Sequence, residues 1–361
     1  MDPWPIKIAT PGRICLFGDH QDYLGLPVIA CAIDRYMHLE ARPNDFGVFR
    51  IDMPDIAGHR VVTLDDHFEQ LKPGDFFGSG LRFLRRKKIL PEQGYDLRIH
   101  SDIPINAGTS SSSALMVAWL HFLLSSIPNA PEPTAETLAE WAYQAEVIEH
   151  QAPGGKMDQY TIALGDIVMI ETNKTLDYQY LPSKINGLVL AESGIPKSTI
   201  GVLGDLSGKA KTAITMVKQS VPDFDLASTK RDQIATLEKQ IPQSERSYFK
   251  AAILNHNITE EAYQLMNIQN TDLAALGVKM YEHHEVLRDL LGLTVPKIDA
   301  MIDAAMNAGA YGAKIVGSGG GGSIVAIAPS GKENDIIEAI KSKQAQAAYT
   351  VSVGPGSRIL V

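Results

Sequence analysis

Hydrophobic and polar residues alternate over much of the first half of the chain, which is the pattern of β-strands with one buried face. This alternation predicts strands at 6–10, 14–17, 28–41, 48–64 and 95–100. Apolar residues at helical spacing predict helices at 76–88, 115–124, 135–150 and 159–164. Pro11-Gly12 is expected to separate the first two strands, and 28–41 fits either a strand pair or one long bent strand.

The pattern changes after residue 166, where three short strand-like segments precede a mainly helical region. The strands are predicted at 167–171, 175–181 and 187–192. The helices are predicted at 210–219, 229–239, 245–255, 260–280 and 297–307. We place a boundary between 182 and 186 and expect two domains, 1–182 and 183–361, of the α+β class.

Composition and charge narrow the class of protein. A chain of 361 residues that is 45% hydrophobic can form a sizeable core, and it exceeds the usual length of one compact domain. The formal net charge of −9 argues against a general binder of nucleic acid or of anionic membranes. No apolar run reaches membrane-spanning length, so we expect a cytoplasmic protein. Cys15 and Cys31 are too few for a disulfide framework and are expected to be buried thiols.

The loop 104–114 lies between a predicted strand and an apolar helix and reads PINAGTSSSSA. Gly108 lets a ligand approach the backbone closely, and the N–H groups of the first helical turn favour an anion there. Hydroxyl groups of Ser110, Ser111 and Ser112 can bond phosphate oxygens or ligate a hard cation such as Mg²⁺. The alternative is that these residues simply cap a buried helix.

A second polar segment, 18–25, reads GDHQDYLG. Asp19 and Asp22 offer acceptors, and His20 can donate or accept, so together they suit a ligand with many hydroxyl groups. The competing interpretation is an ordinary solvated turn, because short clusters of Asp, Gly and Tyr are common in exposed loops.

Two further carboxylates stand out from their surroundings. Glu146 lies on a helix otherwise rich in apolar residues, and Asp158 follows a Gly-Gly turn at the start of a short helix. A carboxylate on such a turn can be directed into a cleft, where it orients or deprotonates a hydroxyl nucleophile. For Asp158 the alternative role is that of a helix N-cap.

The segment 312–323 reads GAKIVGSGGGGS and leads into an apolar strand at 324–328. A bare backbone between two strands can lie over a ligand, whereas a plain glycine hairpin is the alternative. Three familiar signatures are missing from the sequence: a complete Walker-type phosphate loop, a zinc protease motif and a protein-kinase catalytic loop.

The order of these segments resembles that of the GHMP small-molecule kinases, and within them the galactokinase branch. The resemblance rests on PGR at 11–13 with GDHQDYLG at 18–25, PINAGTSSSSA at 104–114, GKMDQ at 155–159, HEVLRD at 284–289 and the glycine loop at 312–322. It implies the two-domain GHMP kinase fold with the active site in the cleft between the domains. It also implies ATP-dependent phosphorylation of a monosaccharide, at the anomeric hydroxyl.

The resemblance further implies a role for each motif residue. Asp158 matches the catalytic aspartate, and Arg13 matches the arginine beside the transferred phosphoryl group. The positions that hold sugar hydroxyls fall on Asp19, His20 and Asp22. The positions around the ATP phosphates fall on Gly108, Ser110, Ser111, Ser112, Gly319 and Gly320. The Mg²⁺ ligands fall on Ser112 and Glu146.

Three departures from the galactokinase pattern affect the expected substrate. Galactokinases usually read GEHTDY where this chain reads GDHQDY, and a shorter carboxylate beside a bulkier Gln21 implies a changed contact at the exocyclic end of the sugar. The chain has no clear Tyr-Asn-Arg segment after its middle. The segment 193–199, SGIPKST, resembles the mevalonate-kinase relatives instead.

Two alternatives to a sugar 1-kinase therefore stay open. One is another GHMP enzyme such as a mevalonate or heptose kinase, although the mevalonate branch usually has lysine where this chain has Arg13. The other is a non-catalytic sugar or ATP sensor that keeps the fold. The expected partners are ATP and a small sugar, without nucleic acid or membrane, in a monomer or weak homodimer.

Overall fold

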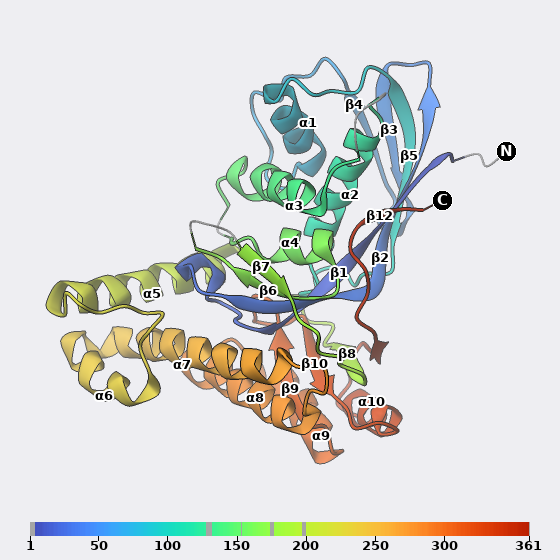
Figure 1. The fold of residues 1–361 in the computed structure, drawn as a ribbon. Coiled ribbons are helices and arrows are strands. Elements are labelled where there is room, and N and C mark those ends of the chain that lie inside the picture. The colour runs from blue at the N-terminus through green and yellow to red at the C-terminus, as the bar shows by residue number, and fades with distance from the viewer. Residues whose placement is uncertain (1–3, 128–131, 153, 174–176, 197–199, 361) are drawn as a thin grey trace.

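This computed structural model of the protein describes residues 4–127, 132–152, 154–173, 177–196 and 200–360. Figure 1 shows two lobes, the first built on a mixed sheet with the strand order β12-β1-β2-β5-β3-β4 and with β6 and β7 attached to β2. The strands of this sheet are β1 (Ile6–Phe17), β2 (Val28–Asn44), β3 (Val48–Met53), β4 (Gly58–Thr63), β5 (Gly94–Ser101), β6 (Ile167–Glu171), β7 (Asp177–Tyr180) and β12 (Arg358–Ile359). The helices of this lobe are α1 (Phe76–Arg86), α2 (Ser111–Ser125), α3 (Ala135–Tyr143) and α4 (Met157–Leu164).

The first two predicted strands are one continuous strand, β1. The register of β1 against β2 shifts between Pro11 and Gly12, so the expected break is a bulge inside a paired strand. Residues 28–44 likewise form one long strand, β2, which resolves the two possibilities for that segment. Because β1 and β2 pair along almost their whole length, they carry the loop 18–25 at one end of the sheet.

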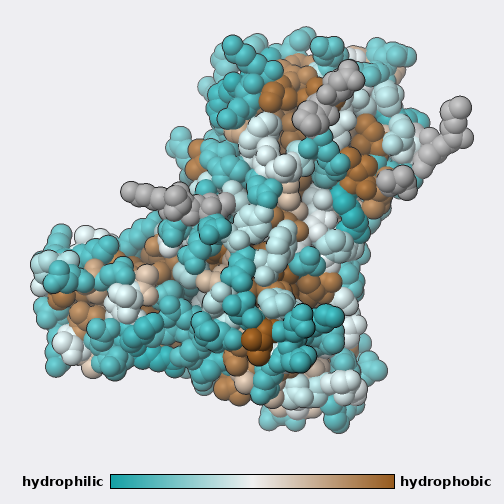
Figure 2. All heavy atoms as spheres, viewed as in Figure 1, coloured by the Kyte–Doolittle hydropathy of each residue, from teal (hydrophilic) through white to brown (hydrophobic). Residues whose placement is uncertain are grey.

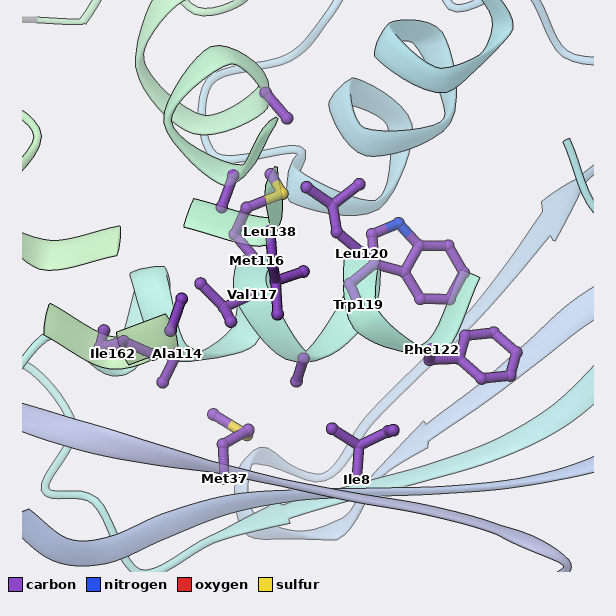
Figure 3. Packing of buried hydrophobic residues seen from close by; sticks show 14 of the residues in the cluster. Ile8, Met37, Ala114, Met116, Val117, Trp119, Leu120, Phe122, Leu138 and Ile162 are labelled. Carbon is purple, nitrogen blue, oxygen red and sulfur yellow. The ribbon is translucent and has the colours of Figure 1, made fainter. Parts of the chain in front are cut away.

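Helix α2 is the centre of the first lobe's core. Most of its side chains are buried, which is the pattern of a helix enclosed on all sides rather than lying at a surface. Figure 3 shows Trp119 and Phe122 on this helix, and Ile8 and Met37 pointing up at it from the strands below. Trp119 is fully buried and packs edge-on against Phe49 at 5.1 Å between ring centroids. The serine loop therefore ends in the first turn of a rigidly held helix, which begins at Ser111.

The second lobe contains a four-stranded antiparallel sheet with the order β11-β8-β10-β9. Its strands are β8 (Leu188–Glu192), β9 (Gly312–Val316), β10 (Ser323–Ile327) and β11 (Ala347–Val351). Its helices are α5 (Ile200–Ser220), α6 (Ile234–Leu237), α7 (Gln243–Met266), α8 (Leu273–Glu285), α9 (Pro296–Asn307) and α10 (Glu333–Lys341). The last residues return to the first lobe, where β12 pairs with β1.

The described residues also form short π-helical and 3₁₀ turns. Two π-helical turns, at Gln144–Ile148 and Val286–Leu290, continue α3 and α8. Short 3₁₀ turns lie at Asp22–Leu24, Pro54–Ile56, Arg231–Gln233 and Glu238–Gln240. Figure 2, a space-filling view from the same side as Figure 1, shows a mainly hydrophilic face with hydrophobic residues in separate areas. No helix among the described residues is long and apolar enough to cross a membrane.

Two helices were predicted at 245–255 and 260–280, and the predicted position of the break between them is wrong. One helix, α7, runs from Gln243 to Met266, and the break falls at 267–272 before Asp272 caps α8. The polar run that suggested a break is buried inside α7. There Asn255 donates to the backbone of Asp19 at 3.4 Å, and Asn257 donates to the backbone of Thr229 at 2.9 Å. Tertiary partners satisfy these polar groups, so the helix continues through them.

Candidate active site

A cavity of about 750 Å³ opens between the two lobes, where the resemblance implies the active site. Residues of the loop after β1, the start of α2, the π turn after α3 and the start of α4 line most of it, and the glycine loop between β9 and β10 contributes Gly317 and Ser318. The predicted residues that line it are Arg13, Asp19, His20, Asp22, Ser111, Ser112, Glu146 and Asp158. Segments more than 300 residues apart thus meet at one site.

Arg13 and Asp158 form the central ion pair of the cavity. The Arg13 Nε atom donates to Asp158 Oδ1 at 2.8 Å, and Nη2 donates to Oδ2 at 2.9 Å. Burial disfavours the charge on Arg13, but Asp158 more than offsets this, and the pKa of Arg13 lies above its ordinary value. The N-cap of α4 is Lys156, so the alternative role of Asp158 as an N-cap is wrong.

The Ser110 hydroxyl, which was predicted to bond phosphate, contacts Asp158 in this structure. It donates to Asp158 Oδ2 at 2.5 Å, and the backbone of Ser110 has a left-handed φ of 61° at the N-cap of α2. Asp158 therefore accepts from a guanidinium and a hydroxyl at once. This combination fixes the orientation of its carboxylate relative to the start of α2.

Asp22 is the second carboxylate on this side of the cavity. It packs so closely on Gly155 that any side chain there would collide with it, since a Cβ atom would lie 1.9 Å from Asp22 Oδ2. Burial raises the pKa of Asp22 to about 6, and the charge of Asp158 adds to the rise. The Gly-Gly turn before α4 thus makes room for a carboxylate from another loop.

Asp19 lies at the floor of the cavity and is already engaged by a cation. Lys314 of β9 donates from Nζ to Asp19 Oδ2 at 2.6 Å, and both side chains are almost completely buried. Burial alone would raise the pKa of Asp19, but the Lys314 ammonium outweighs it, and the pKa lies below its ordinary value. Sequence reasoning missed Lys314, because a lysine within an apolar strand gives no indication of its partner.

His20 and Gln21 have different surroundings from each other. His20 lines the cavity in a left-handed conformation with a φ of 62°, and its ring interacts with backbone groups of Gly317 and Ser318. Gln21 is fully buried, and its amide donates to the backbone of Pro27 and contacts Thr259 of α7 at 3.4 Å. Gln21 does not line the cavity, because its side chain secures the loop; the changed contact at the exocyclic end of the sugar stays a prediction.

The two glycine-containing loops touch each other backbone to backbone. A Cβ atom on Gly108 would lie 2.5 Å from the backbone oxygen of Val316, and Gly108 has a left-handed φ of 88°. The backbone oxygen of Gly108 also accepts from Arg13 Nη1 at 2.5 Å. Gly108 is thus required for this close approach between the lobes.

The structure places Gly319 and Gly320 differently from Gly317 and Ser318. The backbone of Gly320 donates to Leu293 at 2.8 Å, and a Cβ atom on Gly319 would collide with the Leu293 side chain. Neither glycine belongs to the lining of the cavity, which takes Gly317 and Ser318 from this loop. Gly319 and Gly320 thus pack on Leu293, which belongs to the core of the second lobe.

Glu146 and the hydroxyl groups at the start of α2 form the part of the site that offers oxygen ligands to a hard cation. Glu146 Oε1 accepts from the Ser113 hydroxyl at 3.0 Å, and Oε2 accepts from Gln159 at 2.7 Å, while Ser112 also interacts with this carboxylate. Burial raises the pKa of Glu146 to about 7 despite these hydrogen bonds. One carboxylate with adjacent hydroxyls fits Mg²⁺, which binds few protein oxygens and keeps other positions for water and phosphate.

The cavity also has apolar lining residues, which the sequence analysis did not predict. Leu71, Phe76 and Val147 line it beside an ion pair, in which Arg82 Nε donates to Glu149 Oε2 at 2.7 Å. These residues belong to the loop before α1, to α1 itself and to the π turn after α3. Such a surface accepts a flat, largely apolar group next to the anion-binding helix terminus.

Comparison with known proteins agrees with this geometry. The chain matches the GHMP kinases N terminal domain over 76–166, the GHMP kinases C terminal over 265–346 and the galactokinase galactose-binding signature over 2–43. A galactokinase from Thermococcus kodakarensis is 27% identical over 342 residues, which cover 91% of this chain and 90% of the relative. A mevalonate kinase from Pyrococcus abyssi is 26% identical over 347 residues, which cover 94% and 93%.

Solved structures show the same fold. A galactokinase from Lactococcus lactis complexed with galactose has a TM-score of 0.88 at 20% identity and covers 98% of this chain and 95% of its own. A mevalonate kinase structure has a TM-score of 0.71 at 19% identity and covers 96% and 98%.

The chain matches the family models of both GHMP kinase domains, and it belongs to that family. Within the family it carries the galactose-binding signature of the first motif, which makes it a galactokinase-like sugar kinase. The segment 193–199 that resembled mevalonate kinases lies partly outside the described residues, at 197–199.

Proposed function

We propose that this protein transfers the γ-phosphoryl group of ATP to the anomeric hydroxyl of an uncharged monosaccharide. The observation that carries the proposal is the joint position of Arg13, Asp158 and the start of α2 in one cavity between the lobes. Phosphoryl transfer needs in-line positioning, neutralisation of phosphate charge and a group that orients the attacking hydroxyl. In this cavity the start of α2 positions the phosphates, Arg13 neutralises phosphate charge, and Asp158 orients the attacking hydroxyl.

ATP fits the cavity in one direction. Its base occupies the apolar end at Leu71, Phe76 and Val147, and its phosphates lie at the N-terminus of α2 beside Ser111 and Ser112. Ser112 and Glu146 would hold Mg²⁺, and Ser113 is a third candidate because it contacts Glu146 directly. When bound, Mg²⁺ neutralises charge on the phosphate oxygens.

The sugar lies at the opposite end, between Asp19, Asp22 and Asp158. Asp158 orients the attacking hydroxyl, whose oxygen forms the new bond to phosphorus while the bond to the ADP oxygen breaks. The two hydrogen bonds from Arg13 favour the charged form of Asp158, so it stabilises the hydroxyl by charge and takes the proton late. Arg13 then balances the charge that develops on the phosphoryl group.

The charges of the cavity favour a neutral sugar over a carboxylated substrate such as mevalonate. Among the described lining residues, the two arginines are already paired: Arg13 with Asp158, and Arg82 with Glu149. Asp19 and Asp22 add carboxylates at the sugar end, and burial keeps the pKa of His20 below its ordinary value. A substrate carboxylate would meet acidic side chains there without a cation to receive it.

The test is ATP consumption by the purified protein with Mg²⁺ across neutral aldoses, N-acetylhexosamines, uronates, heptoses and mevalonate. The position of the product phosphate is then read by ³¹P and ¹³C NMR. We expect turnover of a neutral sugar with phosphate on the anomeric oxygen. Turnover of mevalonate or a heptose instead would establish the alternative kinase activity, and saturable sugar and ATP binding without turnover would establish a sensor.

The remaining expectations follow from the same chemistry. We also propose a monomer or weak homodimer, measured by analytical ultracentrifugation. ATP as the donor places the reaction in the cytoplasm, which fractionation of cells would test.

A further inference from the structure

The floor of the sugar end is an ion pair that joins the two lobes. Asp19 follows β1 in the first lobe, and Lys314 lies on β9 in the second, 295 positions later in the sequence. The ammonium of Lys314 donates to Asp19 Oδ2 at 2.6 Å and to the backbone oxygen of Cys15 at 2.9 Å. Both acceptors belong to the segment that carries the sugar loop.

The surroundings of this pair hold it in one arrangement. Lys314 is 0% exposed and Asp19 is 3% exposed, and Asn255 of α7 donates to the backbone of Asp19. His283 of α8 lies behind the pair with both ring nitrogens unpartnered among the described residues, and burial lowers its pKa to about 3. Lys314 is thus the cation that balances Asp19.

We propose that Lys314 is a positioning residue for substrate specificity: it crosses from the second lobe and holds the Asp19 carboxylate at the floor of the cavity as an acceptor for a neutral sugar hydroxyl. The inference rests on the proposed sugar kinase function.

This arrangement defines the class of sugar that the site accepts. The charge of Lys314 is paired with that of Asp19, and Lys314 does not line the cavity. Lys314 therefore cannot neutralise a substrate carboxylate. Asp19 itself repels an anion and accepts from a hydroxyl. The sugar end therefore selects substrates without a carboxylate, and uronates of the accepted sugar are rejected.

The experiment is a double-mutant cycle with K314M, D19N and the double variant. For K314M we expect the sugar KM to rise at least tenfold, with kcat within threefold and the ATP KM within twofold of the parent. If Lys314 acts through Asp19, adding K314M to D19N raises the sugar KM by less than threefold more. The parent should also turn over the matching uronate at least a hundredfold less efficiently than the neutral sugar.

The pH profile gives a readout that a merely structural role would not move. Without Lys314, burial raises the pKa of Asp19, so kcat/KM for the sugar in K314M should fall toward acid pH with an inflection that the parent lacks. The other titratable or charged groups that interact with Asp19 are Arg13, Cys15, His20, Asp22 and His283. The Lys314 ammonium also acts on Cys15, His20 and His283, so removing it affects these groups as well. An inflection that K314M shows and the K314M/D19N double variant lacks therefore reports Asp19.

Lys279→Met is the matched control. Lys279 pairs with Glu261 at 2.8 Å and Glu282 at 3.0 Å between α7 and α8, away from the cavity lining, so the variant loses a lysine ion pair without touching the sugar loop. Its sugar KM should stay within twofold of the parent. If K314M does not fold, K314R replaces it: the longer cation displaces Asp19, and the sugar KM should rise at least threefold at unchanged ATP KM.

Two results would overturn the proposal while leaving the kinase function intact. One is a sugar KM within twofold of the parent in folded K314M or K314R. The other is equal, additive effects of K314M in the parent and in D19N. Sugar binding measured by calorimetry separates failure of the proposed kinase function from failure of the proposed role of Lys314. If the parent binds a neutral sugar without turnover, only the kinase function is refuted, and the K314M variant must still bind the sugar more weakly. A parent that binds no neutral sugar overturns both.

Discussion

Replacing Asp158 with asparagine removes one charge at the centre of the site. In the protein the carboxylate accepts two hydrogen bonds from Arg13, at 2.8 and 2.9 Å, and one from Ser110 at 2.5 Å. An asparagine keeps one acceptor oxygen, while its NH₂ group faces donors. The variant therefore loses both the charge that orients the attacking hydroxyl and the fixed geometry of the group.

The expected loss of activity follows from those roles. A positioned proton acceptor contributes a factor of about 10² to 10⁴ in rate. That range corresponds to about 3 to 5 kcal/mol in the activation free energy. Arg13 is 5% exposed in its side chain but keeps its contact with the Gly108 backbone, and Asp158 is 28% exposed, so we expect only about 1 to 2 kcal/mol of lost stability. The loss of the charge also relieves repulsion of Asp22 and Glu146, because Asp158 raises the pKa of both groups.

The assay is coupled detection of ADP release under saturating ATP and sugar, together with a thermal unfolding curve. Asp96→Asn is the matched control: Asp96 also pairs with two arginines, at 2.6 Å from Arg50 and 3.3 Å from Arg42, on the sheet face opposite α2. We expect kcat of that control within twofold of the parent. A kcat for Asp158→Asn within severalfold of the parent would refute the assignment of Asp158.

The remaining predictions concern different parts of the molecule. Ser110→Ala should lower kcat about tenfold at unchanged ATP KM, because Ser110 orients Asp158; a raised ATP KM would instead assign its hydroxyl to phosphate. Trp119→Ala should cost about 3 to 5 kcal/mol of unfolding free energy by chemical denaturation, and a loss below 1 kcal/mol would contradict the packing of α2. Asp22→Asn should weaken sugar binding but raise the melting temperature at pH 8, since the pKa of Asp22 is raised to about 6 in the folded protein and burial of its charge is unfavourable above that pH. This stability gain should shrink as the pH falls from 6 toward 4, where Asp22 is protonated in the folded parent; a gain independent of pH would disprove the cause.

The sequence alone determined most of the local structure and the position of each chemical motif. Alternation and helical spacing depend on neighbours within a few residues, so β6 and α1 could be located with no knowledge of the fold. The start of α2 was placed too late, at 115, because its first turn at Ser111 is polar and carries no hydrophobic pattern. The motif order indicated the family, and Cys15 and Cys31 are free and buried as expected. Arg13, Asp22, Glu146 and Asp158 were also correctly expected to share one cleft.

The tertiary structure decided what those residues contact. Gln21 contacts Thr259 of α7, and Ser110 donates a hydrogen bond to Asp158. Asp19 pairs with Lys314, and Gly319 packs against Leu293. The buried polar residues that looked like a helix break are satisfied by segments from elsewhere in the chain. Each of these contacts joins positions tens to hundreds of residues apart, and hydrogen bonds and ion pairs act over a few ångströms in space. Only the packing of the two lobes against each other brings such partners within that distance.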